Sequence, residues 1–260
     1  MNCSTRTLDN PSLLELLRSG GWWSGYCDAM RQLNEAVDDA GAIRALRLAA
    51  WAFGASGAMF SHVVQHDASL SVLRTLVACD TPWANAYAAE GWFEDDPWLR
   101  HAAQQTTTVQ ASDIATDGPR QQAVVDALRA HGFASAIVVP APSNVGRSRI
   151  GMLCIGSTQS DYFAGAAFEL LRPLVRGLAM ELGDWWMRQL RAGLVARAHV
   201  TADDLKLLRH EAQGHSSKTI ARSMGAQMAA IDSRFQRLNR RLGVACRRDA
   251  MRLGRLYGLI

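Results

Sequence analysis

The chain has 260 residues, a formal net charge of +4 at pH 7 and 48% hydrophobic residues, so it is long and apolar enough for two ordinary globular domains. No apolar run reaches about 18 residues, so we expect no transmembrane helix and no membrane partner. The N-terminus has no basic segment followed by an apolar core, so we expect no signal peptide.

The net charge conceals an asymmetry between the two halves of the chain. About +8 lies after residue 195 and about −4 before it. A basic segment joined to an acidic one predicts that one half binds nucleic acid, and a chance imbalance is the alternative. The five cysteines are scattered without metal-ligand spacing, so we expect no zinc site, no cofactor and a reducing, cytoplasmic location.

Helices are expected at several places in the first half of the chain. Residues 1 to about 25 predict a short helix and a loop, and residues 27–53 predict a single long helix. Asp96-Pro97 is expected to begin a further helix, because proline suits the first helical position. Residues 119–131 predict another helix.

Strands alternate with these helices. They are expected at residues 57–65, 70–78, 106–111, 134–141 and 149–157. Turns are expected at residues 66–68 and 143–146. This order of elements predicts an α+β domain in which an antiparallel sheet lies between helices, as an α-β-α sandwich. Such layers can enclose a small molecule.

A long amphipathic helix is expected from about Ser160 to Gln189. Its apolar face is longer than a small domain needs to cover a sheet, so it is either a core helix or part of a dimer surface. Residues 190–199, centred on Gly193, are expected to form a linker. The expected domains are therefore residues 1–189 and residues 200–260.

Residues 200–260 predict an all-α domain of four helices. Thr201 and Asp204 have the spacing of a capping pair at a helix start, and Ser216 can cap the second helix. Gly214 ends the first helix, and Gly225 allows a sharp turn because glycine tolerates positive φ. A short helix, a glycine-containing turn and a longer amphipathic helix make a helix-turn-helix.

The third of these helices has apolar residues on one side only, namely Ile231, Phe235, Leu238 and Leu242. Its other side carries arginine and amide groups that suit the DNA major groove, where arginine pairs with guanine and glutamine with adenine. An ordinary bundle with a solvated charged face is the alternative. The residues expected to contact DNA are Lys218, Ser233, Gln236, Arg237, Arg240 and Arg241.

This stretch resembles the C-terminal DNA-binding domain of the LuxR family of bacterial transcription regulators. The matching positions are Val200, Thr201, Asp204, Leu208, Gly214, Ile220, Ala221, Ala230, Ile231, Leu242, Val244, Gly258, Leu259 and Ile260. The resemblance implies a homodimer that binds a palindromic site in double-stranded DNA. The sequence departs from the family at Asp204, where the family has glutamate, and at Gln227, a poorer cap than the usual serine. Asp232 replaces a basic residue, so we expect it to repel phosphate.

Three polar side chains stand out in the acidic half. Trp83, Tyr87 and Asp96 supply an indole N–H, a phenol O–H and a carboxylate within one short segment. Trp83 and Tyr87 are one helical turn apart and can point the same way. Taken alone, tryptophan and tyrosine at this spacing are more typical of a protein core.

The same segment resembles the autoinducer-binding domain of the LuxR family, whose tryptophan, tyrosine and Asp-Pro pattern is matched by Trp83, Tyr87, Asp96 and Pro97. The resemblance implies an N-acyl homoserine lactone as ligand. It also implies that the tryptophan donates to the lactone carbonyl, the tyrosine to the amide carbonyl, and that the aspartate accepts from the amide N–H.

Four positions of the implied ligand site differ from the family. Ala111 stands where a second tryptophan is usual, Ala136 replaces a glycine, Cys79 a frequent tyrosine, and Cys154 a serine or threonine that helps to bind the amide. Cysteine is a weak substitute in hydrogen bonding. The smaller side chains at 111 and 79 predict a wider pocket that prefers a longer or bulkier acyl group.

The combined interpretation is a dimeric, DNA-binding regulator of quorum sensing that is controlled by an acyl homoserine lactone and is not an enzyme. One alternative is a LuxR-type regulator that acts without lactone or as an inhibitory heterodimer partner. A remote alternative is an enzyme that uses Cys154 or Cys79 with a histidine, since a nucleophile needs an adjacent base.

Overall fold

The computed structural model describes residues 12–65, 71–79, 87, 91–142 and 149–260. The chain divides into two compact units. The first comprises residues 1–63 and 72–183, and the second comprises residues 64–71 and 184–260. Among the described residues, no helix is both long and apolar enough to cross a membrane.

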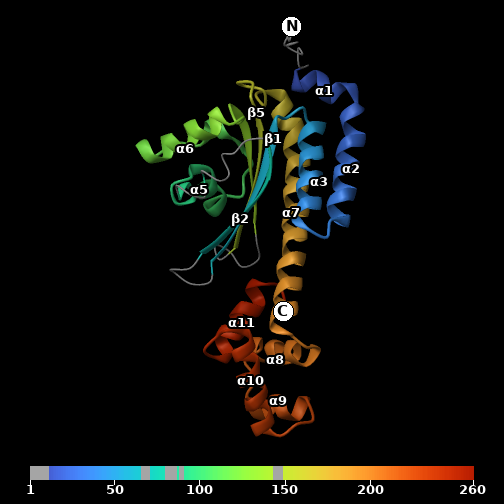
Figure 1. The fold of residues 1–260 in the computed structure, drawn as a ribbon, viewed down its shortest axis with the longest axis vertical. Helices are drawn as coiled ribbons and strands as arrows, with labels where there is room; N and C mark the ends of the chain where they lie inside the picture. The colour runs from blue at the N-terminus through green and yellow to red at the C-terminus, as the bar shows by residue number, and fades with distance from the viewer. Residues whose placement is uncertain (1–11, 66–70, 80–86, 88–90, 143–148) are drawn as a thin grey trace, which may run out of the picture. The chain divides into compact units, whose positions relative to one another are not determined.

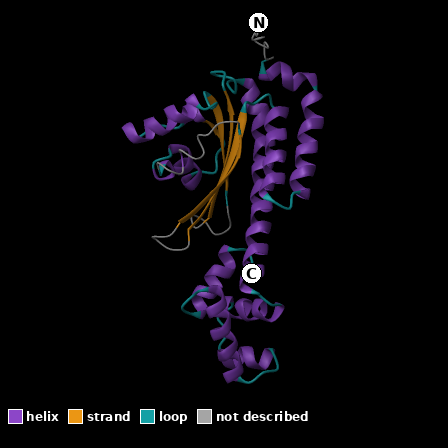
Figure 2. Ribbon diagram, in the orientation of Figure 1, coloured by secondary structure: helices purple, strands orange, loops and turns teal. Residues whose placement is uncertain are grey.

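The first unit is built on a five-stranded sheet in the order β2-β1-β5-β4-β3. The strands are drawn in orange in Figure 2. The strands are β1 (Gly57–Gln65), β2 (Ser71–Ala78), β3 (Val109–Gln110), β4 (Ser135–Ala141) and β5 (Arg149–Ser157). Strands β4 and β5 pair antiparallel, as do β3 and β4. The expected strands are confirmed, but of the expected residues 106–111 only Val109–Gln110 form β3, and a 3-10 turn, Ala111–Asp113, follows it directly. The expected turns at 66–68 and 143–146 lie outside the described residues.

Helices cover both faces of this sheet (Figure 1). One face carries α2 (Gly21–Glu35), α3 (Asp39–Ala52) and the N-terminal part of α7 (Ala166–Ala198), and the short α1 (Leu13–Ser19) precedes α2. The other face carries α5 (Pro97–Gln104) and α6 (Pro119–Ala130). The predicted arrangement of an antiparallel sheet among helices is therefore confirmed for this unit.

The single helix expected at residues 27–53 is wrong. The chain leaves the helix after Glu35 and starts α3 at Asp39. Asp38 has an extended backbone, and its side chain accepts a hydrogen bond from the Gly41 N–H at 2.8 Å, which caps the new helix. An aspartate at this position satisfies a free N–H at the start of a helix, which favours a new helix here. The loop expected near residue 25 is likewise helical, because α2 already begins at Gly21.

Helix α7 is longer than expected and displaced toward the C-terminus. It begins at Ala166, after a turn in which Asp161 and Gly165 have positive φ, and it continues to Ala198. Of the residues expected to form a linker, 190–199, residues 190–198 are therefore helical. Gly193 disfavours a helix by only about 1 kcal/mol relative to alanine, which is too little to end one that packs on its neighbours.

The second unit contains the helices α8 (Ala202–Ala212), α9 (Ser217–Ser223), α10 (Met228–Leu242) and α11 (Arg247–Leu256). Two apolar clusters hold them. One centres on Leu208, Leu238 and Ala250 with the end of α7, and the other on Leu207, Ile220 and Phe235. Gly225 lies between α9 and α10 with a φ of 59°. The helices thus fall where the capping and glycine signals predicted them.

The face of the sheet beneath α5 and α6 is closed at one end by a large aromatic ring. Ala136 on β4 pairs with Gly156 on β5, and the Phe133 ring packs over that glycine. A Cβ atom at position 156 would lie 2.2 Å from the ring. Glycine is required here because any side chain would displace the ring.

We expect Gly156→Ala to lower the free energy of unfolding by about 1–3 kcal/mol, as overpacking does in a closed core. Gly183→Ala is the matched control, since a methyl group added there would meet no heavy atom within 4 Å outside the local backbone, and alanine favours a helix. Urea unfolding of both variants measures the difference. Equal stability of the two variants would show that Phe133 moves aside without strain.

Candidate functional site

An apolar cluster fills the space between the sheet and α5 and α6, and we call it the α5-side cluster. Its strand residues alternate, because every second side chain of a strand points to the same face of a sheet. Its buried members are Met59, Tyr87, Trp98, Leu99, Val124, Leu128, Phe133, Ala136, Val138, Met152 and Cys154.

One carboxylate, that of Asp96, is buried beside this cluster and is only 2% exposed. Asp96 is the cap of α5, where Pro97 takes the first helical position. Its Oδ1 accepts the backbone N–H of Trp98 at 2.8 Å and that of Leu99 at 3.3 Å. The Asp-Pro signal therefore does two things: it starts the helix and it places an anion against an apolar core.

Tyr87 supplies a third hydrogen-bond donor to this carboxylate. Its hydroxyl donates to Oδ2 of Asp96 at 2.6 Å, and its ring meets Trp92 edge-on with centroids 6.4 Å apart. Burial raises the pKa of Tyr87 well above 10, and the nearby Asp96 charge raises it further. Burial also raises the pKa of Asp96, although the bonds from Tyr87, Trp98 and Leu99 oppose that rise. The tyrosine is therefore a proton donor held in place.

The Tyr87–Asp96 pair has the donor and acceptor capacity to bind an amide. Each carboxylate oxygen can accept about two hydrogen bonds. Within the described part of the chain, Oδ1 has two donors and Oδ2 has one, so Oδ2 keeps one acceptor position. A ligand N–H can take that position, and a ligand carbonyl can accept the tyrosine proton.

Two of the other expected ligand residues, Cys154 and Ala136, belong to the α5-side cluster, and Trp83 lies outside the described residues. Cys154 is fully buried on β5, and Ala136 is buried on the neighbouring strand β4. Burial raises the pKa of the Cys154 thiol well above its usual range, and the Asp96 charge raises it further. A thiol held protonated in this way is a poor nucleophile.

Ala111 packs at the border of the α5-side cluster rather than within it. Trp92 and Phe93 pack against the same cluster. The cluster thus has other aromatic groups at its border although position 111 lacks an indole. A preference for bulkier acyl groups stays a prediction.

Two aromatic residues of the α5-side cluster, Trp98 and Phe133, were not predicted as site residues from the sequence. Their rings meet edge-on with centroids 6.3 Å apart. Periodicity places both residues in ordinary core positions, and only the Gly156 contact shows why an aromatic ring is needed there.

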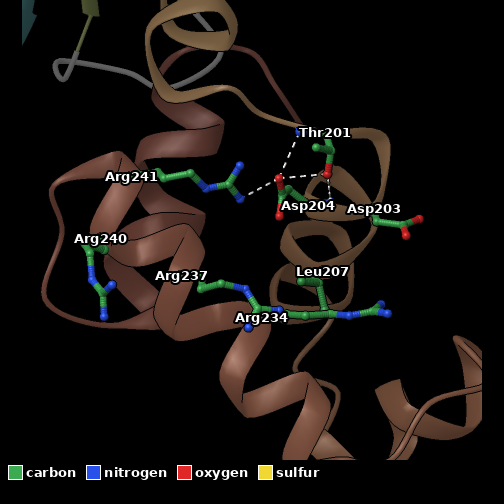
Figure 3. A pocket seen from close by; sticks show the side chains of 8 residues that line it. All are labelled: Thr201, Asp203, Asp204, Leu207, Arg234, Arg237, Arg240 and Arg241. Carbon is green, nitrogen blue, oxygen red and sulfur yellow. Dashed lines mark hydrogen bonds and ion pairs between the residues drawn. The ribbon is translucent and has the colours of Figure 1, made fainter.

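In the second unit, most of the residues expected to contact DNA are exposed. Lys218 lies on α9, and Ser233, Gln236, Arg237 and Arg240 lie on α10. Across the described residues, none of these five side chains has a hydrogen-bonding or ionic partner. A cleft of about 570 Å³ lies between α8 and α10, and Arg234, Arg237, Arg240 and Arg241 contribute to its lining (Figure 3).

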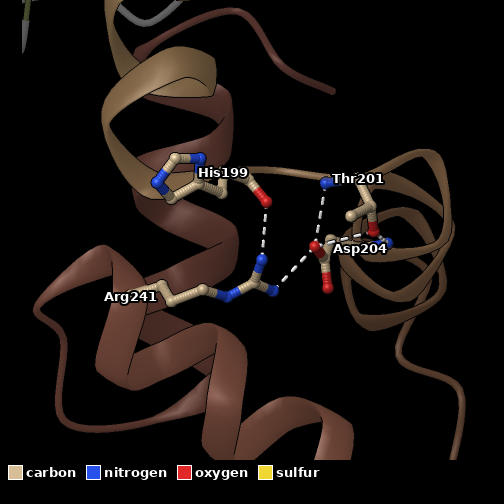
Figure 4. A network of polar contacts seen from close by, with 4 residues as sticks. All are labelled: His199, Thr201, Asp204 and Arg241. Atoms are coloured by element: carbon tan, nitrogen blue, oxygen red, sulfur yellow. Dashed lines mark hydrogen bonds and ion pairs between the residues drawn. The ribbon is translucent and has the colours of Figure 1, made fainter.

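Arg241 differs from the other three arginines that line this cleft because its guanidinium is engaged within the domain (Figure 4). It donates to the His199 carbonyl at 2.6 Å and to Oδ2 of Asp204 at 2.7 Å. Asp204 also accepts the Thr201 backbone N–H at 2.9 Å, which completes the predicted capping pair of α8. Arg241 therefore ties α10 to the start of α8, and a DNA phosphate would have to compete for it.

Asp232 is also engaged, contrary to the expectation of a free acid that repels phosphate. Its carboxylate accepts from Ser217 at 2.9 Å and forms an ion pair with Arg247, whose guanidinium lies 4.4 Å above the Phe235 ring. The bonds from Ser217 and Arg247 lower the pKa of Asp232. The acid is thus neutralised locally and links α9, α10 and α11. By contrast, the side chain of Gln227 makes no capping hydrogen bond, as its residue type predicts.

Comparisons with known proteins identify a matching family and similar folds. The autoinducer binding domain family matches residues 38–182. A crystal structure of Escherichia coli SdiA has a similar fold, at a TM-score of 0.68 and 14% identity over 92% of this chain and 99% of that chain. The structure of SdiA in complex with octanoyl-rac-glycerol has a TM-score of 0.65 and 14% sequence identity, over 92% of this chain and 96% of that chain.

The N-acylhomoserine lactone dependent LuxR family transcription factor CepR2 from Burkholderia cenocepacia is a further structural match. Its TM-score is 0.55 at 18% identity, over 65% of this chain and 98% of that chain. At such identities these likenesses show the fold alone. No curated protein sequence matches the chain significantly.

The Asp204 network predicts a pH dependence of the second unit. Burial raises the pKa of Asp204, but the bonds from Thr201 and Arg241 lower it more, so the net pKa is lowered. Because the pKa of Asp204 is lower in the folded than in the unfolded protein, its carboxylate stabilises the fold at pH values above the unfolded pKa of about 3.9. This contribution is lost as the pH falls through the folded pKa. We expect Asp204→Asn to weaken α8 by about 1–3 kcal/mol at pH 7, and to differ less from wild type toward pH 3.

Hydrogen exchange of the α8 amides, compared between variant and wild type at each pH, measures this difference. Asp203→Asn is the control, since Asp203 is exposed and its ion pair is with Lys206 on the same helix. A difference from wild type that stays constant down to pH 3 would show that the charge of Asp204 has no part in it.

Proposed function

The chain belongs to the autoinducer binding domain family, and on this basis we propose that it is a LuxR-type transcription regulator of quorum sensing. In this proposal the domain of residues 1–189 binds an N-acyl homoserine lactone. The domain of residues 200–260 binds double-stranded DNA, and residues 190–199 connect the two. The protein acts in the cytoplasm as a homodimer and catalyses no reaction.

The observation that supports lactone binding best is the buried Tyr87–Asp96 pair. An amide group that enters a dry site needs one acceptor for its N–H and one donor for its carbonyl, and each unmade bond costs about 1–3 kcal/mol. Asp96 offers the acceptor and Tyr87 the donor, 2.6 Å apart. When the Tyr87 hydroxyl donates to the ligand carbonyl instead of to Asp96, the amide N–H takes its place on the carboxylate. No buried group is then left without a hydrogen-bonding partner.

The surroundings of the pair suit an acyl chain. The α5-side cluster consists mainly of apolar side chains, and each methylene buried there contributes about 0.8 kcal/mol. SdiA, which shares the fold, is known in complex with octanoyl-rac-glycerol, an acyl ester without an amide N–H. An acylglycerol is therefore the competing class of ligand. Its ester has no N–H to donate, so a glycerol hydroxyl would donate to the open acceptor position of Asp96 instead.

The α10 face supports DNA binding. Arg237 and Arg240 are exposed, lie one helical turn apart and have no ionic partner among the described residues. The ion pair with Arg247 offsets the negative charge of Asp232, which would otherwise oppose a phosphate. A helix that buries one side and presents arginine and glutamine on the other can read base edges in the major groove.

The exposed side of α7 supports a dimer. Leu170 and Met180 are 56% and 46% exposed, and Pro173 and Gly177 lie between them at helical spacing. Exposed apolar residues along one helix face indicate an interaction surface. A second copy of the chain fits this surface, because the DNA site expected for this class of regulator is palindromic.

One observation favours a second candidate function, a regulator that needs no lactone. Asp96 already has three donors, from Tyr87 and two backbone N–H groups, without a ligand. A first domain whose buried carboxylate already has these hydrogen bonds can fold without a ligand. It can then also form a homodimer or a heterodimer without a ligand. Expression with and without added lactone separates the two functions, since a ligand that binds the folded state stabilises it by RT ln(1 + [L]/Kd) and so raises the melting temperature.

We expect Asp96→Asn to weaken binding of an acyl homoserine lactone at least tenfold. Asparagine still caps α5, so the fold persists, but it lacks the charge that strengthens the bond to the ligand N–H. Octanoyl-rac-glycerol is the comparison ligand, and any loss of its affinity measures the bond from a glycerol hydroxyl to Asp96. Asp95→Asn is the matched control, since Asp95 pairs with Arg120 at the surface. Isothermal titration measures both ligands, and an unchanged lactone affinity in Asp96→Asn would exclude the carboxylate as the anchor.

We expect Arg237→Ala and Arg240→Ala each to weaken DNA binding and to lower the slope of log K against log salt by about one. The loss follows from one fewer phosphate or base contact. Gel retardation on a mixed-sequence duplex at several salt concentrations measures the slope, and hydrogen exchange checks the fold. Arg252→Ala on α11 is the control, because the ion pair of Arg252 is with Asp249 of its own helix. A wild-type slope in both α10 variants would place the DNA contact elsewhere.

A further inference from the structure

The cleft between α8 and α10 is strongly basic. Its volume of about 570 Å³ is within the range of pockets that hold small molecules. The charged residues of its lining are Asp203, Asp204, Arg234, Arg237, Arg240 and Arg241. Arg234 is the one arginine of this lining that was not expected to contact DNA, and Figure 3 shows it extending from α10 toward α8.

Both acids of the lining are already paired. Asp204 forms an ion pair with Arg241 at 2.7 Å, and Asp203 forms one with Lys206 at 3.0 Å. In the part of the chain that the structure describes, the other three arginines of the lining have no hydrogen-bonding or ionic partner, namely Arg234, Arg237 and Arg240. The cleft therefore keeps three positive charges that no acid of the described chain offsets.

The helix places these three unpaired arginines at neighbouring positions. Arg234 and Arg237 are three residues apart, as are Arg237 and Arg240, and residues at this spacing are neighbours on a helix surface. Like charges on neighbouring positions disfavour a helix. The side chains of Arg234 and Arg237 both extend toward α8 (Figure 3). An anion bound between them would offset this repulsion, so its binding should stabilise the second unit.

The chemistry of these side chains favours phosphate. A guanidinium group can donate two parallel hydrogen bonds to phosphate oxygens. A terminal phosphate group carries a charge of about −1.5 to −2 at pH 7 and has three acceptor oxygens, whereas each phosphodiester of DNA carries a single charge. Three unpaired guanidinium groups around one cleft therefore match a free di- or triphosphate better than a single phosphate of the DNA backbone.

We propose that this cleft binds a free di- or triphosphate, either inorganic or at the end of a nucleotide, and that the bound anion excludes DNA. Exclusion follows because Arg237 and Arg240 line the cleft and are also the residues expected to contact DNA. A bound anion neutralises these groups and adds negative charge where a DNA phosphate approaches. The exclusion of DNA rests on the proposed function, whereas binding of the anion does not.

The alternative is that the cleft receives a phosphate of the DNA backbone. In that case Arg234 is one more DNA contact, and its loss lowers the slope of log K against log salt by about one. A free diphosphate would then bind no better than another divalent anion at the same ionic strength. Binding of the free anion in the absence of DNA is therefore the quantity that decides.

The test titrates the full chain with pyrophosphate, with ADP and, as a reference anion, with sulfate. The titrations are made by calorimetry at constant ionic strength, without DNA or divalent cations. We expect saturable binding of pyrophosphate or ADP but not of sulfate, and a higher melting temperature in the presence of the bound anion. Arg234→Ala should weaken this binding about tenfold, because one of the guanidinium groups that hold the anion is lost.

Arg222→Ala is the matched control. Arg222 is exposed on α9 and does not line the cleft, so its loss lowers the net charge by the same amount as Arg234→Ala. The affinity for the anion should be unchanged in this control. If Arg234→Ala does not fold, Arg234→Gln, which keeps a long side chain, replaces it.

A second measurement adds a DNA duplex and follows gel retardation at constant ionic strength. Pyrophosphate or ADP, whichever binds more tightly, should release the duplex from the wild-type chain. About tenfold more of the same anion should be needed to release it from Arg234→Ala. Tighter binding of ADP assigns a nucleotide as the source of the anion, and tighter binding of pyrophosphate assigns an inorganic one.

The outcomes separate this inference from the proposed function. Equal affinity for sulfate, pyrophosphate and ADP, or an equal loss in Arg234→Ala and Arg222→Ala, would overturn the anion site. Saturable binding of the anion that leaves the duplex bound would overturn the exclusion of DNA. If no duplex binds under any condition, the proposed DNA-binding function fails, and the titration without DNA still decides whether the cleft holds the anion.

Discussion

The first unit depends on the burial of one negative charge. A carboxylate removed from water needs several hydrogen-bond donors, and Asp96 obtains them from the first turn of α5 and from Tyr87. This requirement fixes where α5 begins and brings the Tyr87 hydroxyl to the start of that helix. It also gives a role to Trp92, which stands edge-on to the tyrosine, since a donor must be held in one orientation to serve a buried anion. The candidate site is a consequence of this single constraint.

Acidic residues have a corresponding role in the basic second unit. Asp204 caps α8 and pairs with Arg241 of α10, and Asp232 of α10 pairs with Arg247 of α11. Each acid takes one arginine out of the positive surface and uses it to join two helices. Among the described residues, Arg237 and Arg240 have no such partner, and they face solvent. Arg241 and Arg247 therefore join helices, whereas Arg237 and Arg240 form an exposed basic face.

Much of this architecture could be predicted from local signals, because they act within a few residues. The Asp-Pro pair places α5, the Thr201–Asp204 pair places α8, and alternation places β1. The break at Asp38 was missed because the flanking residues continue a helical pattern, and the side-chain bond to Gly41 that starts α3 is not visible in that pattern. Pairings across long separations, such as Ser61 with Thr75 or Asp204 with Arg241, have no signature in spacing. They arise from the register of the sheet and the packing of helices.

Asp96 already has three hydrogen-bond donors without a ligand, which limits the polar free energy that a ligand can add. An incoming amide exchanges the Tyr87–Asp96 bond for two bonds of its own, so much of the polar gain is offset by the bond that is given up. The acyl chain, at about 0.8 kcal/mol per buried methylene, then supplies most of the affinity, and the anchor supplies orientation.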